Sequence, residues 1–598
     1  MLDYLFTTAQ YGMIILSVAI AVRCLRSMLS GRNDPEIWAY IQAGDDKIPV
    51  YHWENIIGRG ASADIRVFGR GINRTHAVLK RSDKGIWYVY DVFSRSGVWV
   101  NGARVYTFGQ ALNHGDIINL GGGCVRFLEA SKAQRFENED ARTSAGKNVS
   151  PVITLFELTL FQIFLLSQHL LISSKQDILY IAASFAVVIV LEWSLYNAMR
   201  LIDRKGFEVE TLAFYLTTLG LSVCCGKSPS DLPKQILLTI VSVALFLLCG
   251  LWLRKLKRTS TFRIPVAIFA LLLLALNVLT GSTSYGARNW LTFGGYSFQP
   301  SEIVKCAYIY VGAATMEKLY GRRNLFLFIA FSAICVIALA LIGDFGTALI
   351  FFVTFLVISF MRSGSIATVL LAVTGAGLAG FLAVTVKPYI ANRFAVWGHV
   401  WEDVYDKGYQ QTRAMSALAS GGLIGKGAGG GWLKNIFAAD TDMVFALIAE
   451  ELGLIVAVSM VFSVLIMAFF AVRCARNGRS SYYAIAACAS VSMLLTQMSL
   501  NVFGSLDILP FTGVTFPFVS KGGSSLMSCW MLMAFLKSAD NRKEASFAVK
   551  SAKKAKSANF EELSPAQLGF DNLDKIELED YYDEDLEFMD EFEGDGEI

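Results

Sequence analysis

The sequence predicts a polytopic α-helical membrane protein of about 13 spans, with a small all-β sandwich inserted after the first span. Hydrophobic residues make up 54% of the 598 positions and charged residues only 17%, whereas soluble chains carry about 25% charged residues. Long apolar runs recur along most of the chain, and one polar stretch alternates with the period of a β-strand. The composition excludes an ordinary soluble enzyme, and ten Cys in this length exclude a disulfide-rich secreted scaffold.

The apolar runs approach the length of roughly 20 residues that crosses about 30 Å of hydrocarbon. The predicted spans lie near residues 8–28, 152–173, 178–198, 210–226, 235–253, 263–280, 303–317, 324–342, 346–361, 366–386, 443–472, 482–503 and 521–537. An odd number of spans places the N-terminus and the C-terminus on opposite sides of the membrane.

Basic residues between the spans predict the orientation. Residues 561–598 hold sixteen Asp or Glu and one Lys, so this segment carries −15 and the rest of the chain, whose total is +3, carries +18. The basic clusters all fall on one side, which the positive-inside rule assigns to the cytoplasm; they lie at 23–32, 200–205, 254–258, 318–323 and 473–479. The connections that then face outward are 227–234, 281–302, 343–345, 387–442 and 504–520. This positive excess belongs with membrane lipids, and we expect no nucleic-acid partner.

A soluble insert follows the first span. Residues 86–90, 98–100 and 116–120 alternate with period two between Gly, Asn and Asp turns, which is typical of a small β-sandwich. The predicted parts of the chain are a first span (1–30), the sandwich (48–130), a polar linker (131–151), two further spans (152–200), a membrane core (205–540) that contains the long loop 387–442, and a basic-then-acidic tail (541–598) that we expect to be disordered.

Short motifs in the sandwich carry a resemblance. Gly58-Arg59, Asn73-Arg74-Thr75-His76, Ser94-Arg95-Ser96-Gly97 and Val100-Asn101-Gly102 occur in an order and spacing similar to those of forkhead-associated (FHA) domains. That resemblance implies binding of a phosphothreonine peptide by the sandwich loops. The implied contacts are Arg59 as the phosphate-facing cation and Asn73, Arg74, Ser94, Arg95 and Asn101 around it.

Two residues depart from the FHA pattern. Asn73 stands where the family usually has Ser, and Ser96 where it usually has Asn. The alternative is therefore an FHA-shaped scaffold that docks a partner without phosphate. We expect His76 to pack in the core of the sandwich.

Polar residues cluster in the outward connections of the predicted membrane core. Glu302 and Lys305 share one helical face at i, i+3 inside an apolar run, where an ionisable side chain is costly unless it is paired or hydrated. They either face a water-filled cavity or form an ion pair that locks two spans together. Asp344 lies in a tight turn between two spans, where its carboxylate would accept bonds from neighbouring amides or bind Lys305.

The long loop 387–442 contains the largest set of polar residues. Its glycine-rich part, Gly421 to Gly431, includes Lys426, and glycines allow backbone amides to approach an anion closely. The loop ends with Asp440-Thr441-Asp442, just before a predicted span.

These strings together resemble the shape, elongation, division and sporulation (SEDS) family, over about residues 205–540. The strings are Gly-Ala-Arg-Asn-Trp from 286, Gln-Pro-Ser-Glu from 299, Asp-Phe-Gly-Thr-Ala from 344, Gly-Tyr-Gln from 408, Gly-Gly-Leu-Ile-Gly-Lys-Gly from 421, Thr-Asp-Met from 441, Glu-Glu-Leu-Gly from 450, Leu-Pro-Phe-Thr-Gly from 509 and Gly-Gly-Ser-Ser from 522. The family has a ten-span core, so the first three predicted spans are additional here. Asp440, Met443 and Lys521 depart from the family's usual His, Phe and Tyr.

The resemblance implies a peptidoglycan glycosyltransferase that polymerises lipid II on the outer face of the bacterial cytoplasmic membrane. The family's essential aspartate maps to Asp442, which would act as the general base. Lys426, Arg288 and the glycine amides are candidates to stabilise the leaving pyrophosphate, and Glu302, Lys305, Asp344, Gln410, Ser520 and Lys521 are candidates to line the substrate cavity. Asp440 would either raise the pKa of Asp442 or help hold a divalent cation (Mg²⁺ or Mn²⁺).

Other interpretations remain open. Asp442 could be an ordinary N-cap, since Asp is favoured there, and the protein could be a lipid II flippase or an inactive scaffold. The expected partners of the leading interpretation are lipid II, a class B penicillin-binding protein that supplies transpeptidation, and a phosphothreonine protein or Ser/Thr kinase target of the FHA domain. The FHA domain and the tail would be cytoplasmic, and the acidic tail is either simply solvated or binds a basic partner.

Overall fold

The structure is a computed structural model that describes residues 2–540 apart from short gaps. The gaps are residues 31–35, 61–62, 83–84, 93, 107, 132–133, 135–148, 202–205, 285–286, 294–295, 317–321, 364–365, 387–390 and 392–393. The predicted tail (541–598) and most of the predicted linker (131–151) therefore lie outside the described residues.

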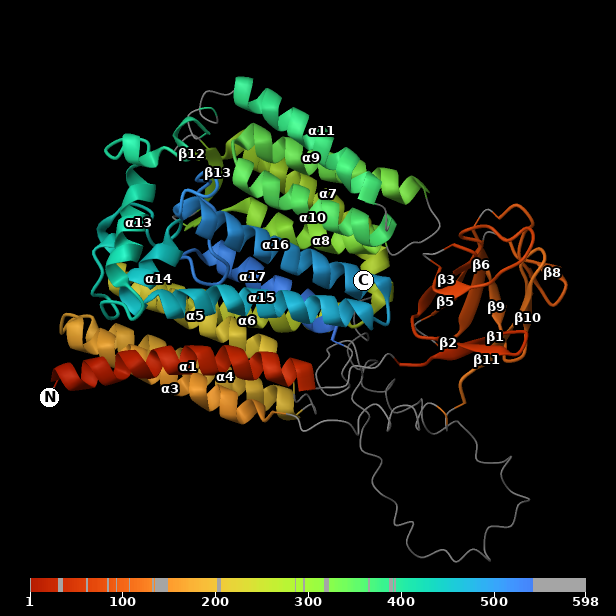
Figure 1. Ribbon diagram of the computed structural model, residues 1–598, viewed down its shortest axis with the longest axis horizontal. Coiled ribbons are helices and arrows are strands. Elements are labelled where there is room, and N and C mark those ends of the chain that lie inside the picture. The colour runs from red at the N-terminus through yellow and green to blue at the C-terminus, as the bar shows by residue number, and fades with distance from the viewer. Residues whose placement is uncertain are drawn as a thin grey trace, which may run out of the picture. The chain divides into compact units, whose positions relative to one another are not determined.

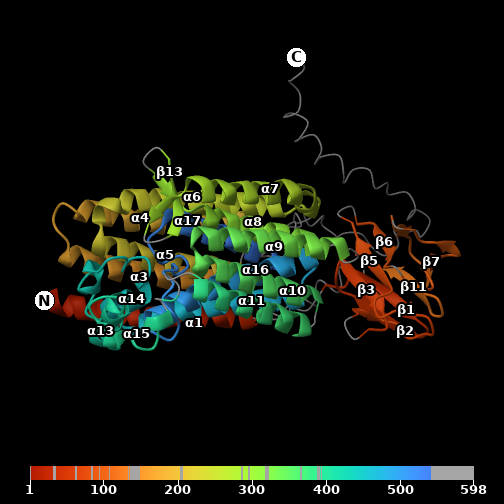
Figure 2. The same cartoon turned by 90° about the horizontal axis from the view of Figure 1, so that it is seen from above.

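Helices form one bundle, and every predicted span coincides with at least one of them (Figures 1 and 2). The long helices are α1 (Leu2–Ser30), α3 (Pro151–Ile172), α4 (Ile178–Leu201), α5 (Glu208–Lys227), α6 (Leu232–Leu253), α7 (Leu256–Thr280), α8 (Pro300–Met316), α9 (Arg322–Ile342), α10 (Phe345–Ser363), α11 (Ile366–Val386), α14 (Val444–Leu452), α15 (Leu454–Arg476), α16 (Ser481–Ser505) and α17 (Gly523–Ser538). The prediction of a multi-span helical membrane protein is confirmed.

The number of spans differs from the predicted thirteen. Within the described residues, nine helices are long and apolar enough to cross a membrane: α1, α3, α4, α5, α6, α7, α9, α15 and α16. α10 is apolar but shorter, and α8 and α17 have only 17 and 16 residues. α8 is buried along its whole length, so its polar residues face other helices and not lipid.

The predicted single span 443–472 is wrong, because the chain breaks there into α14 and α15. Gly453 separates the two helices with φ 94°, a left-handed conformation that glycine adopts without strain. A side chain at this position would overlap the backbone of Leu423 and Ile424. Close packing of the long loop on the helix therefore requires the break.

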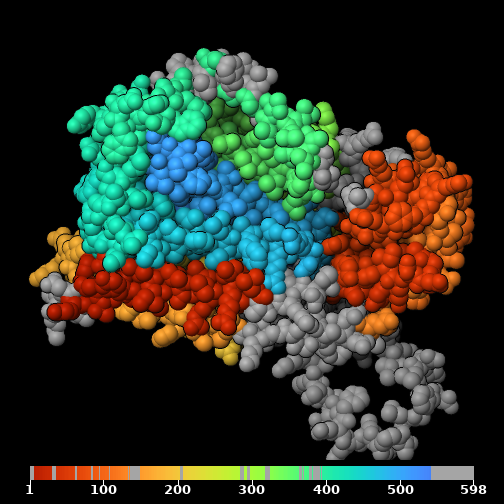
Figure 3. All heavy atoms as spheres, viewed as in Figure 1, coloured from red at the N-terminus to blue at the C-terminus, as the bar shows by residue number. Residues whose placement is uncertain are grey.

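The three helices before the SEDS-like core pack directly on it. α1 lies against α3, α5 and α15, and α4 lies against α6. Figure 3 shows α1, in red, along the surface formed by the C-terminal half of the core. The additional spans are therefore part of the bundle.

The insert is a two-sheet β-sandwich, as predicted. One sheet has the order β2-β1-β11-β10-β7-β8 and the other the order β4-β3-β5-β6-β9. The strands are β1 (Ala39–Ala43), β2 (Asp46–Val50), β3 (Glu54–Gly58), β4 (Ile65–Arg66), β5 (Ala77–Arg81), β6 (Trp87–Asp91), β7 (Trp99–Val100), β8 (Ala103–Arg104), β9 (Gln110–Leu112), β10 (Ile117–Asn119) and β11 (Cys124–Glu129).

The core of the sandwich is formed by alternating strand residues. Alternate residues of β6 and β11, including Trp87 and Phe127, are buried between the sheets. The sandwich begins at Ala39, before the predicted boundary at 48, because β1 pairs with both β2 and β11. The five residues of β1 do not show the clear alternation of polar and apolar residues that would have predicted a strand from the sequence.

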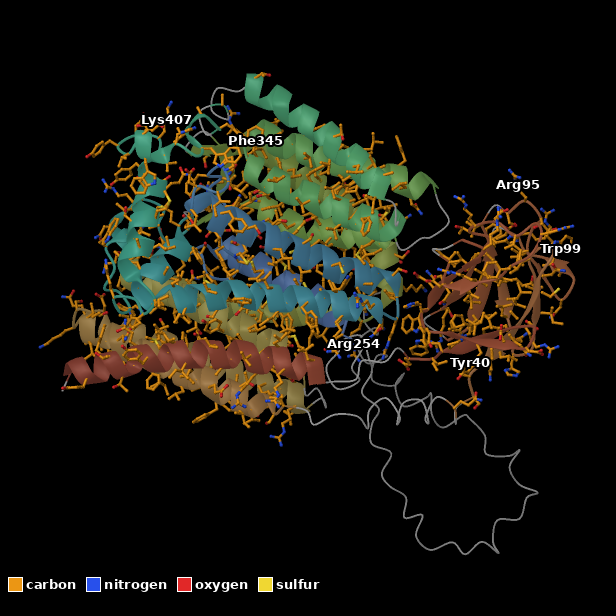
Figure 4. All side chains as sticks on the ribbon, in the orientation of Figure 1. Tyr40, Arg95, Trp99, Arg254, Phe345 and Lys407 are labelled. Atoms are coloured by element: carbon orange, nitrogen blue, oxygen red, sulfur yellow. The ribbon has the colours of Figure 1, made fainter. Side chains whose placement is uncertain are left out.

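Two of the predicted outward connections have their own structure. Residues 282–298 form a three-stranded sheet of β12 (Ser282–Ser284), β13 (Ala287–Phe293) and β14 (Tyr296–Phe298). The long loop contains α13 (Tyr409–Gly421) and the short helices η2 (Val400–Glu402) and η3 (Leu433–Asn435). Figure 4 shows Phe345 and Lys407 toward one end of the bundle and Arg254 at the other end.

Candidate functional site

The segment that ends at Asp442 is held by three parts of the core. Asp442 is half-buried, and its backbone N–H donates to the Ala438 carbonyl at 2.8 Å. From α16, the Asn501 amide donates to the carbonyls of Asp442 (3.1 Å) and Val514 (2.8 Å). The Ser520 hydroxyl donates to the Thr441 carbonyl. The backbone before α14 is therefore fixed from two sides.

The carboxylate of Asp442 lies against a glycine. Gly513 has φ 67°, and a Cβ added there would come 3.2 Å from Asp442 Oδ2. The N-cap of α14 is Met443, so the structure does not support the interpretation of Asp442 as the capping residue. Asp442 instead remains partly accessible at the start of the helix.

Asp440 belongs to an ion-pair cluster that also contains Lys227, Lys521 and Asp231. Lys227 Nζ lies 2.8 Å from Asp440 Oδ1, and Lys521 Nζ lies 2.6 Å from Asp231 Oδ2 and 3.8 Å from Asp440 Oδ2. Burial lowers the pKa of Lys521, but the hydrogen bond to Asp231 and the nearby acidic groups more than offset this, so that the pKa lies above its usual value. Lys521 is therefore a cation at neutral pH.

Lys227 and Asp231 were not among the predicted site residues. Both occur in the predicted outward connection 227–234, so their side of the membrane could be predicted, but their contact with the end of a loop 200 residues later could not. The Asp440 carboxylate is bonded to an ammonium and does not fit a divalent-cation ligand. Its charge is also offset by two lysines, which weakens the expected effect on Asp442.

The glycine segment, defined as residues 421–431, and the two residues after it bind carboxylates of the chain itself. Glu450 accepts from the backbone N–H groups of Trp432 (3.1 Å) and Leu433 (2.9 Å), and its Oε1 lies 2.8 Å from Lys426 Nζ. Glu451 accepts from the Gly429 N–H at 2.9 Å.

Backbone carbonyls and a glutamine take further amides of the glycine segment. The Gly425 N–H donates to Gly421, the Lys426 N–H to Glu450 and the Gly427 N–H to Glu451, in each case to the carbonyl oxygen. The Ala428 N–H donates to the Gln168 side chain. We therefore do not assign these amides, or the paired Lys426, to a pyrophosphate.

A second polar cluster lies inside the bundle. Lys305 Nζ is 2.8 Å from Glu302 Oε1, with both side chains at most 4% exposed. Ser528 of α17 donates to Glu302 Oε2 at 2.6 Å, so the pair connects α8 to α17.

Asp344 does not bind Lys305 in the described ion pairs. Its carboxylate accepts from the Thr347 N–H (3.0 Å) and the Gln299 amide (3.1 Å). Burial raises the pKa of Asp344, although the hydrogen bonds from Thr347 and the charge of Lys305 act to lower it. The turn after Asp344 reaches toward Asp442, because Gly346 packs on Val514 beside Gly513.

Two other predicted site residues of the membrane core, Arg288 and Gln410, lie apart from these clusters. Arg288 is exposed on β13. Gln410 donates to the Phe437 carbonyl at 3.2 Å and so connects the start of α13 to the segment before Asp440.

The sandwich carries a separate cationic cavity of about 520 Å³. Three of the predicted FHA residues, Arg59, Asn73 and Arg95, line it together with Ser96. Arg70, which was not predicted from the sequence, adds a further cation. Figure 4 labels Arg95 at this edge of the sandwich. The remaining lining residues are Gly69, Gly71 and Ile72.

The other predicted FHA residues hold the loops. Asn101 has φ 49° and bonds Asp116 and the Ile117 N–H, both at 2.9 Å. Arg74 accepts from the Gly60 N–H through its carbonyl, and the Ser94 N–H donates to Asp91. None of these three residues lines the cavity.

His76 is buried, as expected. Its ring accepts the Asn73 N–H at 3.0 Å and lies 3.2 Å from the Gly97 carbonyl. It therefore ties two of the cavity loops to the core of the sandwich.

The membrane core matches the family model described as "Cell cycle protein" (FtsW, RodA, SpoVE) over residues 222–545. The chain belongs to this SEDS family. A second family model, "FHA domain", matches residues 55–121, so the insert of this SEDS protein is an FHA domain.

Relatives of the SEDS core include named glycosyltransferases. The chain is 30% identical to the probable peptidoglycan glycosyltransferase FtsW of Buchnera aphidicola, over 45% of this chain and 70% of that protein. It is 33% identical to the stage V sporulation protein E of Bacillus subtilis, over 46% of this chain and 77% of that protein. A solved structure described as "Structural coordination of polymerization and crosslinking by a peptidoglycan synthase complex" covers 56% of this chain and 97% of its own, with 25% identity and a TM-score of 0.47.

Proposed function

We propose that this SEDS protein is a peptidoglycan glycosyltransferase that polymerises lipid II, with Asp442 as the general base. The observation that carries the proposal is the placement of Asp442. Asp442 is half-buried and its carboxylate lies against Gly513, while its backbone is bonded to α16. Relatives named as glycosyltransferases support the same reaction class.

The proposed reaction is a displacement at an anomeric carbon. The sugar hydroxyl oxygen of the acceptor forms the new C–O bond, the bond to the lipid diphosphate breaks, and the hydroxyl proton passes to Asp442. The diphosphate leaves with the electron pair of the broken bond, so positive charge must lie near it.

Lys521 and Lys227 are better candidates for this positive charge than Lys426. Both belong to the cluster around Asp440, which is two residues from Asp442. Lys426 is instead bonded to Glu450, in the last turn of α14, and so lies at the end of that helix away from Asp442. Glu302, Lys305 and Asp344 are proposed to shape the floor of the cavity, and Arg288, Gln410 and Ser520 its rim.

The proposed location is the bacterial cytoplasmic membrane, with loop 387–442 outside and the FHA domain inside. Positive charge in the alternate connections supports this sidedness. Both lipid substrates keep their tails in the bilayer while their head groups meet, which suits a catalytic segment at one end of a helical bundle.

The FHA domain is proposed to bind a phosphothreonine peptide, from a protein phosphorylated by a separate Ser/Thr kinase. Three guanidinium groups around one cavity (Arg59, Arg70 and Arg95) support an anionic ligand. A class B penicillin-binding protein is proposed as the second partner, because the glycan strands that a polymerase makes are crosslinked by a transpeptidase and the resemblance to the SEDS family implies that partner.

Glycan synthesis from lipid II by the purified full-length protein in detergent tests the activity. We expect polymer from the wild type, none from Asp442→Asn, and wild-type yield from Asp406→Asn, an exposed residue of the same loop. Polymer formation by Asp442→Asn at the wild-type rate would refute the assignment of Asp442 as the general base. Detergent removes sidedness, so a flippase or an inactive scaffold would give no polymer, with or without a co-purified penicillin-binding protein.

A binding assay tests the FHA ligand. Full-length protein should retain members of a phosphothreonine peptide library and lose them with Arg59→Ala, whereas Arg126→Ala on β11 should retain them. Equal retention of unphosphorylated peptides would favour the phosphate-independent scaffold.

A further inference from the structure

The glycine segment is contacted by two helices that precede the SEDS core. From α1, the Gln10 amide donates to the carbonyls of Ile424 (3.1 Å) and Gly425 (2.7 Å). From α3, Gln168 accepts the Ala428 N–H at 2.9 Å and donates to the Phe6 carbonyl at 3.2 Å. The two glutamines therefore join α1, α3 and the glycine segment in one hydrogen-bonded network.

The fit is steric as well as polar. Gly427 has φ 96°, and a side chain there would overlap the ring of Phe6. Gln10 and Gln168 are buried, at 8% and 0% exposure, and a buried polar group is costly when its partner is lost. The contact is thus a built interface between the added helices and the loop.

The glycine segment in turn holds the helix that follows Asp442. In the last turn of α14, Glu451 accepts from the Gly429 N–H of this segment and Glu450 accepts from the Leu433 N–H just after it, and the Leu454 N–H donates to the Gly422 carbonyl at 3.0 Å. α14 is a nine-residue helix that starts two residues after Asp442. A shift of the glycine segment would therefore move α14 and the carboxylate before it.

We propose that α1 and α3 hold the glycine segment so that α14 presents Asp442 to the substrate, with Gln10 and Gln168 as positioning residues. Neither glutamine is placed to touch the substrate in this proposal; each acts through the backbone it binds. The catalytic part of this inference rests on the proposed glycosyltransferase function, and the hold on the glycine segment does not.

Substitutions at Gln10 separate its donor from its size. Gln10→Glu keeps the shape but places an acceptor against two carbonyls, whereas Gln10→Lys restores N–H donors. Thr8→Val is the matched control, because Thr8 is exposed on the same turn of α1 and its hydroxyl bonds only the Tyr4 carbonyl among the described contacts.

Two measurements on the purified full-length protein test the proposal. In hydrogen–deuterium exchange, peptides covering 424–433 should exchange about fivefold or more faster in Gln10→Glu, as expected for the loss of one or two hydrogen bonds. In lipid II polymerisation, kcat should fall by about fivefold or more with KM within about twofold, because positioning acts on the chemical step. Gln10→Lys should recover both values, and Thr8→Val should match the wild type.

The outcomes separate this inference from the proposed function. Exchange in Gln10→Glu equal to that in Thr8→Val overturns the hold on the glycine segment, whatever the activity. Faster exchange with an unchanged kcat overturns the positioning role. A wild type that makes no polymer overturns the glycosyltransferase, and the positioning role with it, while the exchange result still decides whether α1 holds the loop.

Discussion

Replacing Glu450 with Gln should loosen the glycine segment. The Glu450 carboxylate is fully buried and accepts two backbone N–H bonds and one from Lys426. A glutamine offers only one acceptor oxygen. In its better orientation, the new amide nitrogen would face the Leu433 N–H, so that two donors meet in a buried site.

The cost follows from these contacts. An unsatisfied buried N–H costs about 1–3 kcal/mol, and hydrogen bonds to a charged group are worth more than neutral ones. Lys426 keeps about a third of its side chain in solvent, so the loss of its ion pair adds little. We therefore expect a loss of about 3 kcal/mol in the free energy of local opening, which is about a hundredfold in the opening equilibrium.

Hydrogen–deuterium exchange of peptides covering 425–433 measures this loss directly. Glu450→Gln should raise exchange there by about a hundredfold and lower polymerisation. Glu402→Gln is the control, since Glu402 is 79% exposed in the same loop and should change neither. Exchange within about threefold of the wild type in Glu450→Gln would show that the amides do not depend on the charged carboxylate.

Three further predictions concern the core. Glu302→Gln should lower the free energy of unfolding by about 3–5 kcal/mol, because it leaves Lys305 buried and unpaired. Adding Lys305→Met should restore part of this loss. A double variant whose loss of stability equals the sum of the two single losses would contradict the pairing. Asn501→Ala should cut the polymerisation rate by about tenfold through loss of its bond to the Asp442 carbonyl, and an unchanged rate would show that this bond does not position the base. Gly513→Ala should lower kcat without preventing folding, because φ 67° is strained for Ala and the new methyl would lie 3.2 Å from Asp442 Oδ2. A wild-type kcat in this variant would mean that the Asp442 carboxylate moves freely.

The membrane fold was largely predictable because it depends on local composition. Apolar length located the long helices of the bundle, although α14 and α15 were predicted as one span. The break at Gly453 was not predicted, although a run of thirty residues would span about 45 Å as one helix, well beyond the hydrocarbon thickness. The apolar runs could not show that α8 is enclosed by other helices, because burial within protein and burial in lipid favour the same residues.

The candidate site was only partly predictable, because several of its contacts join distant segments. The order of motifs predicted Arg59 and Asn73, which line the FHA cavity, whereas the ligands of the glycine amides were not predicted. A glycine-rich loop signals exposed N–H groups but not which anion they meet, and here Glu450 and Glu451 reach them from the following helix. Lys227 and Arg70 carried no motif, and only the tertiary fold brings them to Asp440 and to the FHA cavity.

The attachment of α1 bears on how short an active form of this protein can be. The SEDS family match begins at residue 222, so a shortened form that starts there would lack α1 and α3. α1 and α3 supply the hydrogen-bond partners of the Ile424 and Gly425 carbonyls and of the Ala428 N–H. A protein without these two helices would lose these hydrogen bonds to the long loop. The first helix is thus part of the support of the long loop, and any exchange of the FHA module should be made downstream of Ser30, leaving that helix in place.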